Sequence, residues 1–418
     1  MDIDRDRLLA RLEKYFDPTL SDEEMRRLAP SSLEPTNGFQ AQNARAYLLK
    51  RGLRMNGFVR YAYRPFDVRW LYWEPETKLL DRSREEYEAH VSVARHTLVT
   101  QQKPRREWSA PQIIEHIGCL DLMDRGASCF PMYLNKSGRA NLALPGFQLD
   151  SLAGEGSIAP NLSAEGLAYL PGTNEEPSSE SLFLHAVAIL HSPSYARENG
   201  GALRQDWPRV PLPASSETLS SSADIGQALS ALLNSDTAVV GVTQEALRQE
   251  LSGIGVVTSI EGRALNPGAG DLAVTAGWGY AGQGGITMPG QGKVLERAYT
   301  DAEREAIRHG GAGLGLADEE MFACLGDATF DVYLNEIAFW KNIPAAVWEY
   351  TIGGYQVLKK WLSYRESRLL GRPLSECEVR DFTGIARRIA AILLVGPALQ
   401  KSYEAVKSET YLWPCVTG

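Results

Sequence analysis

The segment 58–73, FVRYAYRPFDVRWLYW, restricts the fold of this chain more than any other stretch of its sequence. Large side chains occupy every second position on both sides of Pro65: Val59, Tyr61 and Tyr63 before it, and Val68, Trp70 and Tyr72 after it. Alternation with a period of two is typical of a β-strand. Pro65 stands between Arg64 and Asp67, where the second residue of a turn is expected. The segment therefore predicts a β-hairpin rich in aromatic residues.

Helices are predicted on both sides of this hairpin. The spacing of four large residues near the N-terminus is helical, namely Leu8, Leu9, Leu12 and Tyr15. A second helical candidate covers 43–51, and we interpret residues 1–50 as a helical spacer or docking segment. Residues 179–190, SESLFLHAVAIL, are apolar on every side after a polar start, as in a buried helix.

A boundary between two lobes is predicted near residue 215. The proline-rich stretch 207–213 suits neither a helix nor a central strand, and a run rich in Ser follows it. This divides the chain into lobes 51–215 and 216–418. Residues 264–293 have an unusual density of glycine, which predicts short strands joined by exposed loops of the kind that often carry recognition.

The last hundred residues predict further helices, so the fold class is mixed α/β. One helix has an apolar stripe formed by Tyr355, Leu358, Trp361 and Leu362. The opposite face of the same helix is expected to be polar and to consist of Gln356, Lys360, Ser363 and Ser367. A later helix is expected to turn Val379, Phe382, Ile385, Ala386 and Ile389 inward and to leave Arg380, Arg387 and Arg388 outward.

Composition narrows the class of protein. Hydrophobic residues make up 44% and charged residues 23%, which are ordinary values for a globular protein. No apolar run approaches the roughly 20 residues that span a bilayer, and the charged N-terminus has no signal core, so we expect a cytoplasmic protein with no membrane partner. The five cysteines and six histidines are scattered, which predicts neither a disulfide framework nor a metal site.

Three stretches imitate catalytic motifs. Residues 277–282, GWGYAG, match the glycine pattern of dinucleotide-binding loops, but another loop follows where a helix should begin. Residues 192–195, SPSY, resemble the proline loop of amino-methyltransferases, yet they end a helix and lack the second proline. The third is the set Asp67, Glu76 and Lys78, which has the order of a magnesium nuclease motif. A magnesium-dependent DNA nuclease is therefore one alternative function.

Basic residues beside aromatic ones point to another function. The net charge of −9 argues against a nucleic-acid partner for the chain as a whole, but residues 50–70 hold six basic side chains against one acid, Asp67. Arg and Lys neutralise phosphates, and Arg can also pair with guanine. The candidate DNA-binding residues are Arg60, Arg64, Arg69, Arg82, Arg84, Lys103, Arg105, Arg106, Gln356, Lys359, Lys360, Arg365 and Arg368. By residue type alone, solvated helix faces over an aromatic core explain the same pattern equally well.

An ordered set of motifs resembles one known family. The motifs are YRPFDVRWLY at 63–72, LLDRSR at 79–84, FPMYL at 130–134, AILHSPSY at 188–195, WPRVPL at 207–212 and VWEYTIGGYQVLKKWL at 347–362. Together they are similar to the C-terminal specificity region of type ISP restriction–modification enzymes and related N6-adenine DNA methyltransferases. The resemblance spans 58 to about 405.

The resemblance implies a target-recognition domain that grips double-stranded DNA in a cleft between a hairpin-bearing lobe and a more helical lobe. Its partner would be a methyltransferase domain or subunit that flips an adenine and methylates it with S-adenosylmethionine. In the family that domain precedes the specificity region. This sequence begins after it, so we expect no cofactor in this chain and no enzymatic activity by the chain alone. A protein-interaction module without nucleic acid remains a second alternative, favoured by the acidic total.

Overall fold

A computed structural model describes residues 1–34, 39–80, 85–105, 107–124, 126–136, 158–170 and 178–413. The chain forms two compact units and passes between them more than once. The first unit consists of Met1–Leu98, Ile114–Leu122 and Cys129–Asn161. The second consists of Val99–Ile113, Met123–Ser128 and Leu162–Gly418. The mixed α/β class is confirmed, whereas the lobes 51–215 and 216–418 and the cleft between them stay predictions.

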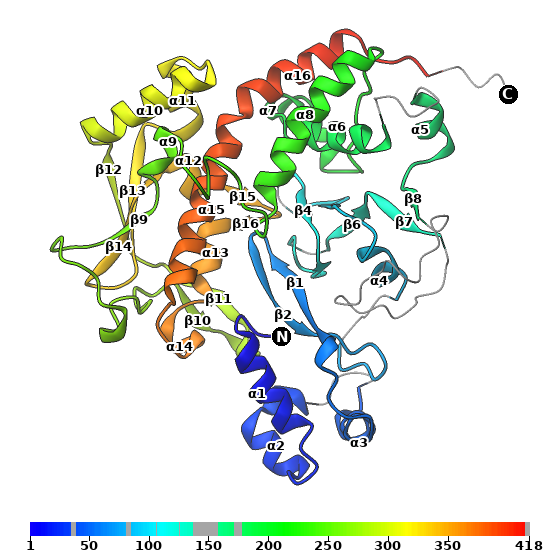
Figure 1. Cartoon of the computed structure of the whole chain (residues 1–418), viewed down its shortest axis with the longest axis vertical. Helices are drawn as coiled ribbons and strands as arrows, with labels where there is room; N and C mark the ends of the chain where they lie inside the picture. Colours follow the sequence, from blue (N-terminus) through cyan, green and yellow to red (C-terminus); the bar gives the residue numbers. More distant parts are fainter. Residues whose placement is uncertain are drawn as a thin grey trace. The chain divides into compact units, whose positions relative to one another are not determined.

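The first unit begins with helices and continues into the predicted hairpin (Figure 1). Its helices are α1 (Arg5–Tyr15), α2 (Asp22–Leu28), α3 (Ala41–Arg51) and α4 (Glu85–Val91). Its strands are β1 (Phe58–Arg64), β2 (Asp67–Tyr72), β5 (Ile117–Gly118), β7 (Tyr133–Asn135) and β8 (Ile158–Pro160). Three short strands lie where the chain passes between the units, namely β3 (Thr97–Thr100), β4 (Gln112–Ile114) and β6 (Ser128–Pro131).

The hairpin forms as predicted. Strands β1 and β2 pair antiparallel from Phe58 opposite Tyr72 to Arg64 opposite Asp67, and β5 adds a parallel neighbour to β1. Pro65 and Phe66 make the turn, and Phe66 adopts a positive φ of 57° that a non-glycine residue rarely takes. Phe66 is nevertheless buried, so the packing of its ring holds this conformation in place.

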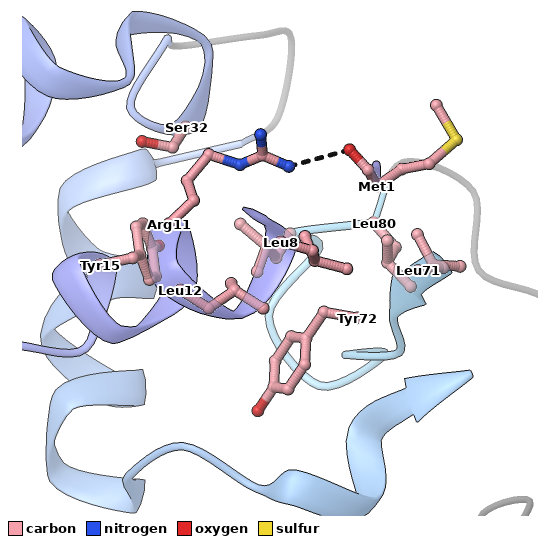
Figure 2. A pocket seen from close by; sticks show the side chains of 10 residues that line it. Met1, Leu8, Arg11, Leu12, Tyr15, Ser32, Leu71, Tyr72 and Leu80 are labelled. Carbon is pink, nitrogen blue, oxygen red and sulfur yellow. Dashed lines mark hydrogen bonds between the residues drawn. The ribbon is translucent and has the colours of Figure 1, made fainter. Parts of the chain in front are cut away.

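Helix α1 packs against the open end of the hairpin, opposite the turn. Leu8 and Leu12 form one core cluster with Phe58 and Tyr72, because the i, i+4 spacing places both leucines on one helix face. A pocket of about 290 Å³ remains between the helix and β2, and half of its lining residues are leucines (Figure 2). Arg11 crosses this pocket, where its Nη2 donates to the Met1 carbonyl oxygen at 2.9 Å. The N-terminal helices thus pack as part of the first unit.

The second unit is the more helical one (Figure 1). Its helices are α5 (Ala164–Tyr169), α6 (Ser179–His191), α7 (Pro193–Leu203), α8 (Ser216–Leu233), α9 (Gln249–Ser252), α10 (Asp301–Leu314), α11 (Asp318–Leu325), α12 (Ala345–Glu349), α13 (Val357–Ser363), α14 (Ser367–Leu370), α15 (Glu376–Leu394) and α16 (Gly396–Ser408). Its strands are β9 (Val256–Ser259), β10 (Gly279–Ala281), β11 (Thr287–Pro289), β12 (Val294–Ala298), β13 (Ala328–Tyr333), β14 (Ala338–Pro344), β15 (Thr351–Ile352) and β16 (Tyr355–Gln356).

An antiparallel sheet in the order β12-β13-β14-β9 packs against α15. Trp340 of β14 stacks on Phe382 of α15 with ring centroids 4.0 Å apart, and Trp361 of α13 meets the same phenylalanine edge-on at 5.5 Å. All three rings are buried. They tie the sheet and two helices into one core.

The inward face predicted for α15 is confirmed, but Arg388 was wrongly expected to point outward. Its guanidinium is buried and donates to the carbonyl oxygens of Ala231 and Leu232 in the last turn of α8 and to that of Thr237 just after the helix. The last carbonyls of a helix have no partner within that helix. Arg388 satisfies two of these carbonyls, and this explains why a charged residue lies on the apolar face of its own helix.

Helix α6 is the buried helix predicted at 179–190, and it packs tightly against α8. A β-carbon at Gly226 would lie 1.9 Å from the carbonyl oxygen of Leu184, so only glycine allows this approach. Helix α6 ends before Pro193, which opens α7 as its first residue. The segment 192–195 is therefore a junction between two helices, as the sequence indicated.

The segment Glu376–Ser408 is long and apolar enough to cross a membrane by length and composition alone. More than half of its most apolar window, 56%, is buried inside the fold. Burial of this kind is typical of a core helix, and α15 is the core helix of the second unit.

Candidate nucleic-acid interface

Arg60 lies on the half-buried face of the hairpin in the first unit. Its guanidinium stands 5.1 Å from the ring centroid of Trp70 on the paired strand. Arg5, from the start of α1, stands 5.6 Å from the same ring and 5.2 Å from that of Phe58. A cation over an aromatic face is attracted by the ring itself, so this contact does not consume its hydrogen-bond donors. Arg5 and Arg60 thus present two cations held by one tryptophan.

The other two hairpin arginines have structural contacts. Arg69 is buried, and its Nε and Nη2 both donate to Oδ2 of Asp67, at 3.0 and 2.6 Å. Arg64 is half-buried and donates to the carbonyl oxygen of Tyr63. The guanidiniums of Arg64 and Arg69 lie 4.1 and 4.0 Å from the Tyr63 ring centroid. These arginines hold the turn together, and Arg69 is too buried to reach a phosphate.

The remaining candidate DNA-binding residues from the first half of the chain fall into two groups. Lys103 and Arg105 are exposed residues of the second unit. Arg82, Arg84 and Arg106 lie outside the described residues.

The second unit carries a further basic set on α13 and α14. Lys360 is half-exposed, with its Nζ 4.7 Å from the ring centroid of Tyr364 and 5.6 Å from that of Tyr355. Lys359 beside it is also half-exposed, and Arg368 on α14 is exposed. Arg368 donates to the carbonyl oxygen of Gly279 at 2.7 Å, which leaves other donors of the same guanidinium at the surface.

The polar face predicted for this helix does not form, because α13 ends at Ser363. Ser363 is buried, and Ser367 belongs to α14 instead. Gln356 precedes the helix, and its Nε2 donates to the carbonyl oxygen of Trp348 at 2.7 Å. One of the two N–H groups of its side-chain amide is therefore engaged by the protein's own backbone.

Arg365 also has a structural position. It is buried, its guanidinium lies 3.6 Å from the ring centroid of Trp361, and its Nη1 donates to the Trp361 carbonyl oxygen. It further approaches the carboxylate of Glu378, which Arg372 also binds. Burial alone would raise the pKa of Glu378, but hydrogen bonds from Arg372 and from the Ser375 backbone outweigh it and lower that pKa overall. The buried carboxylate is thereby held charged in the capping box at the start of α15.

The structure does not assemble the nuclease motif. Asp67 is buried and bound to Arg69, whereas Glu76 bonds to Arg54 at 2.9 Å and to Arg51 at 3.2 Å. Each acid is thus paired with arginine rather than with the other acid. Among the described residues, no group of three or more His, Cys, Asp or Glu side chains could hold a metal ion.

The residues present do not fit S-adenosylmethionine at the glycine-rich segment. Residues 277–282 contain strand β10, and only a three-residue 3₁₀ turn, Gln283–Gly285, follows before β11, so no α-helix N-terminus faces a bound cofactor there. No step of the chemistry is therefore assigned to this segment.

The two histidines of α6 are structural. His185 is fully buried; its Nε2 donates to the Pro211 carbonyl oxygen at 2.9 Å, so its Nδ1 accepts from the Ser222 hydroxyl at 2.9 Å. His191 bonds to the Pro111 carbonyl oxygen at 3.0 Å. Burial lowers the pKa of each imidazole to about 4. Both rings are therefore neutral at pH 7.

We expect the free energy of unfolding to fall as the pH drops from 6.5 towards 4. In this window the unfolded histidines bind protons that the folded ones do not. At pH 5 the loss from His185 alone is about 2 kcal/mol relative to pH 7. Urea unfolding at both pH values should show a smaller drop in His185→Gln, whose amide can still donate to Pro211. The exposed His309→Gln is the control, and equal drops in all three proteins would contradict this assignment.

Sequence reasoning missed several of these positions. Arg5 was read only as part of a charged N-terminus, although its helix brings it over Trp70. The β10–β11 hairpin was expected only as short strands and loops. Its glycine density was the available signal, and packing of α13 and α14 against it was not visible in the sequence.

Comparison with known proteins gives one family. The model of the Type ISP C-terminal specificity domain matches residues 1–376, most of the chain. No curated protein matches the sequence significantly.

Three solved structures have a similar fold. The ATP-dependent Type ISP restriction-modification enzyme LlaBIII bound to DNA aligns over 96% of this chain and 22% of its own, with a TM-score of 0.54 and 13% identity. A nuclease-deletion mutant of the Type ISP enzyme LlaGI with a DNA substrate mimic aligns over 95% and 30%, with 0.50 and 14%. A DrdV–DNA complex aligns over 100% and 34%, with 0.51 and 18%. This chain thus spans between about a fifth and a third of those proteins.

Proposed function

Because the chain belongs to the Type ISP C-terminal specificity domain family, we propose that it recognises the DNA target sequence of a restriction–modification enzyme. The observation that carries the proposal is the family match over residues 1–376. The similar solved enzymes are described as bound to DNA or to a DNA substrate mimic, which supports duplex DNA as the partner.

We propose that cations at the surface of each unit contact DNA phosphates, while other side chains read the bases. Arg5 of α1 and Arg60 of the hairpin, together with Lys359, Lys360 and Arg368 of α13 and α14, would meet phosphates in this proposal. Phosphate contacts fix position on the duplex, and side chains that reach base edges supply specificity. The buried Arg69 and Arg365 are left out of the proposed interface, as is the half-buried Gln356, whose amide is held against the Trp348 carbonyl oxygen.

The proposal places methyl transfer, and the S-adenosylmethionine it consumes, in a methyltransferase domain or subunit that works with this chain. The recognition unit would hold the duplex so that this partner receives an adenine. We propose the cytoplasm as the compartment in which this protein meets its DNA partner.

Lys360→Ala should weaken binding to every duplex about fivefold at 0.15 M salt and reduce the slope of log K against log salt by about one. The reason is that Tyr355 and Tyr364 hold the ammonium group in a fixed position for one phosphate. The measurement is a fluorescence anisotropy titration at several salt concentrations, on duplexes selected from a random library by the full chain.

Lys401→Ala is the matched control, since it removes the same charge from an exposed position on α16. An unchanged slope in Lys360→Ala would remove α13 from the interface. Failure of the wild-type chain to select or bind any duplex would contradict the proposed function itself.

A further inference from the structure

The glycine-rich segment forms a two-stranded ribbon with a defined register. Strands β10 and β11 pair antiparallel, with Tyr280 opposite Met288 and Ala281 opposite Thr287. The backbone N–H of Gly282 donates to the carbonyl oxygen of Ile286 at 2.7 Å and closes the tip. The ribbon lies beside α13 and α14 in the second unit (Figure 1).

The base of the ribbon is fixed to these helices. A β-carbon at Gly279 would lie 1.9 Å from the Ser363 carbonyl oxygen, so the strand touches the end of α13 directly. The backbone N–H of Trp278 donates to the buried carboxylate of Glu366 at 2.7 Å, and Arg368 donates to the carbonyl oxygen of Gly279. A base held at this many points presents its tip in one orientation, which lowers the entropic cost of binding.

The two faces of the ribbon differ. Successive side chains of a strand point to opposite faces, so Tyr280, Ile286 and Met288 share one face. Their exposed fractions are 45%, 67% and 42%. The face with Gly279 is the one turned to α13, so the large apolar side chains point away from the helix that holds the ribbon.

The surrounding charge indicates what covers this apolar face. The chain holds 52 acidic residues among 418, yet none occurs between Asp271 and Glu296. The helices that hold the ribbon add the accessible cations Lys360 and Arg368. A ribbon whose own segment carries no acid, held by helices that carry Lys360 and Arg368, suits a partner with apolar groups set in a polyanionic frame.

We propose that the β10–β11 ribbon enters the major groove of DNA and packs Ile286 and Met288 against thymine methyl groups. The inference rests on the proposed function and names the element that reads bases. The major groove is wide enough to admit a two-stranded ribbon, and the thymine C5-methyl is the apolar group it displays. Lys360 and Arg368 would then meet the phosphates beside the groove.

The test uses deoxyuridine, which lacks only the C5-methyl group of thymidine. The full chain first selects a duplex from a random library, and each thymine of that duplex is then replaced in turn. We expect the wild type to lose about fourfold in affinity at one or two adjacent positions, the value for burial of one methyl group. In Ile286→Ala/Met288→Ala the same replacements should have no effect.

Ile260→Ala is the matched control, because it removes an apolar side chain that is 50% exposed outside the ribbon. It should keep the full response to deoxyuridine, and circular dichroism should show all variants folded. Duplex binding by the wild type with no response to deoxyuridine, or with the same response in the ribbon variant, would overturn this inference and leave the proposed function standing.

Two further outcomes would also overturn it. If the ribbon variant binds DNA normally but loses self-association in sedimentation, the face is a protein interface. If the wild-type chain binds no duplex at all, both the proposed function and this inference fail.

Discussion

Replacing Trp278 with alanine is expected to lower the free energy of unfolding by about 3–5 kcal/mol, as large aromatic truncations in a core do. The Trp278 side chain is fully buried, and its Nε1 donates to the Tyr333 carbonyl oxygen at 2.8 Å. Its ring meets that of Trp348 edge-on at 5.5 Å. The backbone of Gly292, just after the ribbon, packs so closely on the same ring that a β-carbon there would lie 2.1 Å from it.

Urea unfolding of two further variants separates the contribution of the buried ring from that of its hydrogen bond. Trp278→Phe keeps most of the buried area but leaves the Tyr333 carbonyl oxygen without its donor, so its loss should be smaller, about 1–3 kcal/mol. Tyr280→Ala changes an exposed ring on the next-but-one residue and should stay within about 0.5 kcal/mol of wild type. Equal stability of Trp278→Ala and the wild type would show that the ribbon is not anchored by this residue.

The hairpin and the apolar faces of the long helices could be predicted from sequence because local spacing determines them. Alternation over 58–73 gave β1 and β2, and the spacing of Val379, Phe382 and Ile389 gave the inward face of α15. In both cases a single periodic pattern decides which side chains are buried.

Residues whose role depends on distant backbone could not be predicted in this way. Arg388 is buried because the end of α8, more than 150 residues earlier, presents carbonyl oxygens to it. Ser367 was expected on the same helix face as Gln356, but α13 ends at Ser363. Tertiary contacts, not local spacing, determine where this helix ends. Periodicity records neither kind of constraint.

The basic residues show the same limit at the candidate interface. Arg60 and Arg69 lie on one hairpin, yet Arg60 stands over Trp70 while Arg69 is buried against Asp67. Charge and spacing alone make the two equivalent. Only the burial of each side chain separates the half-exposed Arg60, which we propose for phosphate, from the buried Arg69, which holds the turn.

The second large effect is sequence selectivity of the chain by itself. If target recognition resides in these residues, the duplex selected by the chain should bind at least about 10³-fold more tightly than a scrambled duplex of the same length and composition. Non-specific binding comes from phosphate contacts, which both duplexes offer equally. The difference therefore isolates contacts with base edges and DNA shape.

The measurement is the ratio of the two dissociation constants for the full chain, taken by anisotropy at 0.15 M salt. The salt concentration must be the same for both duplexes, because phosphate contacts depend steeply on it. A ratio of about 10³ or more is the predicted result. A ratio near one, with clear binding to both duplexes, would contradict the claim that this chain is the target-recognition unit.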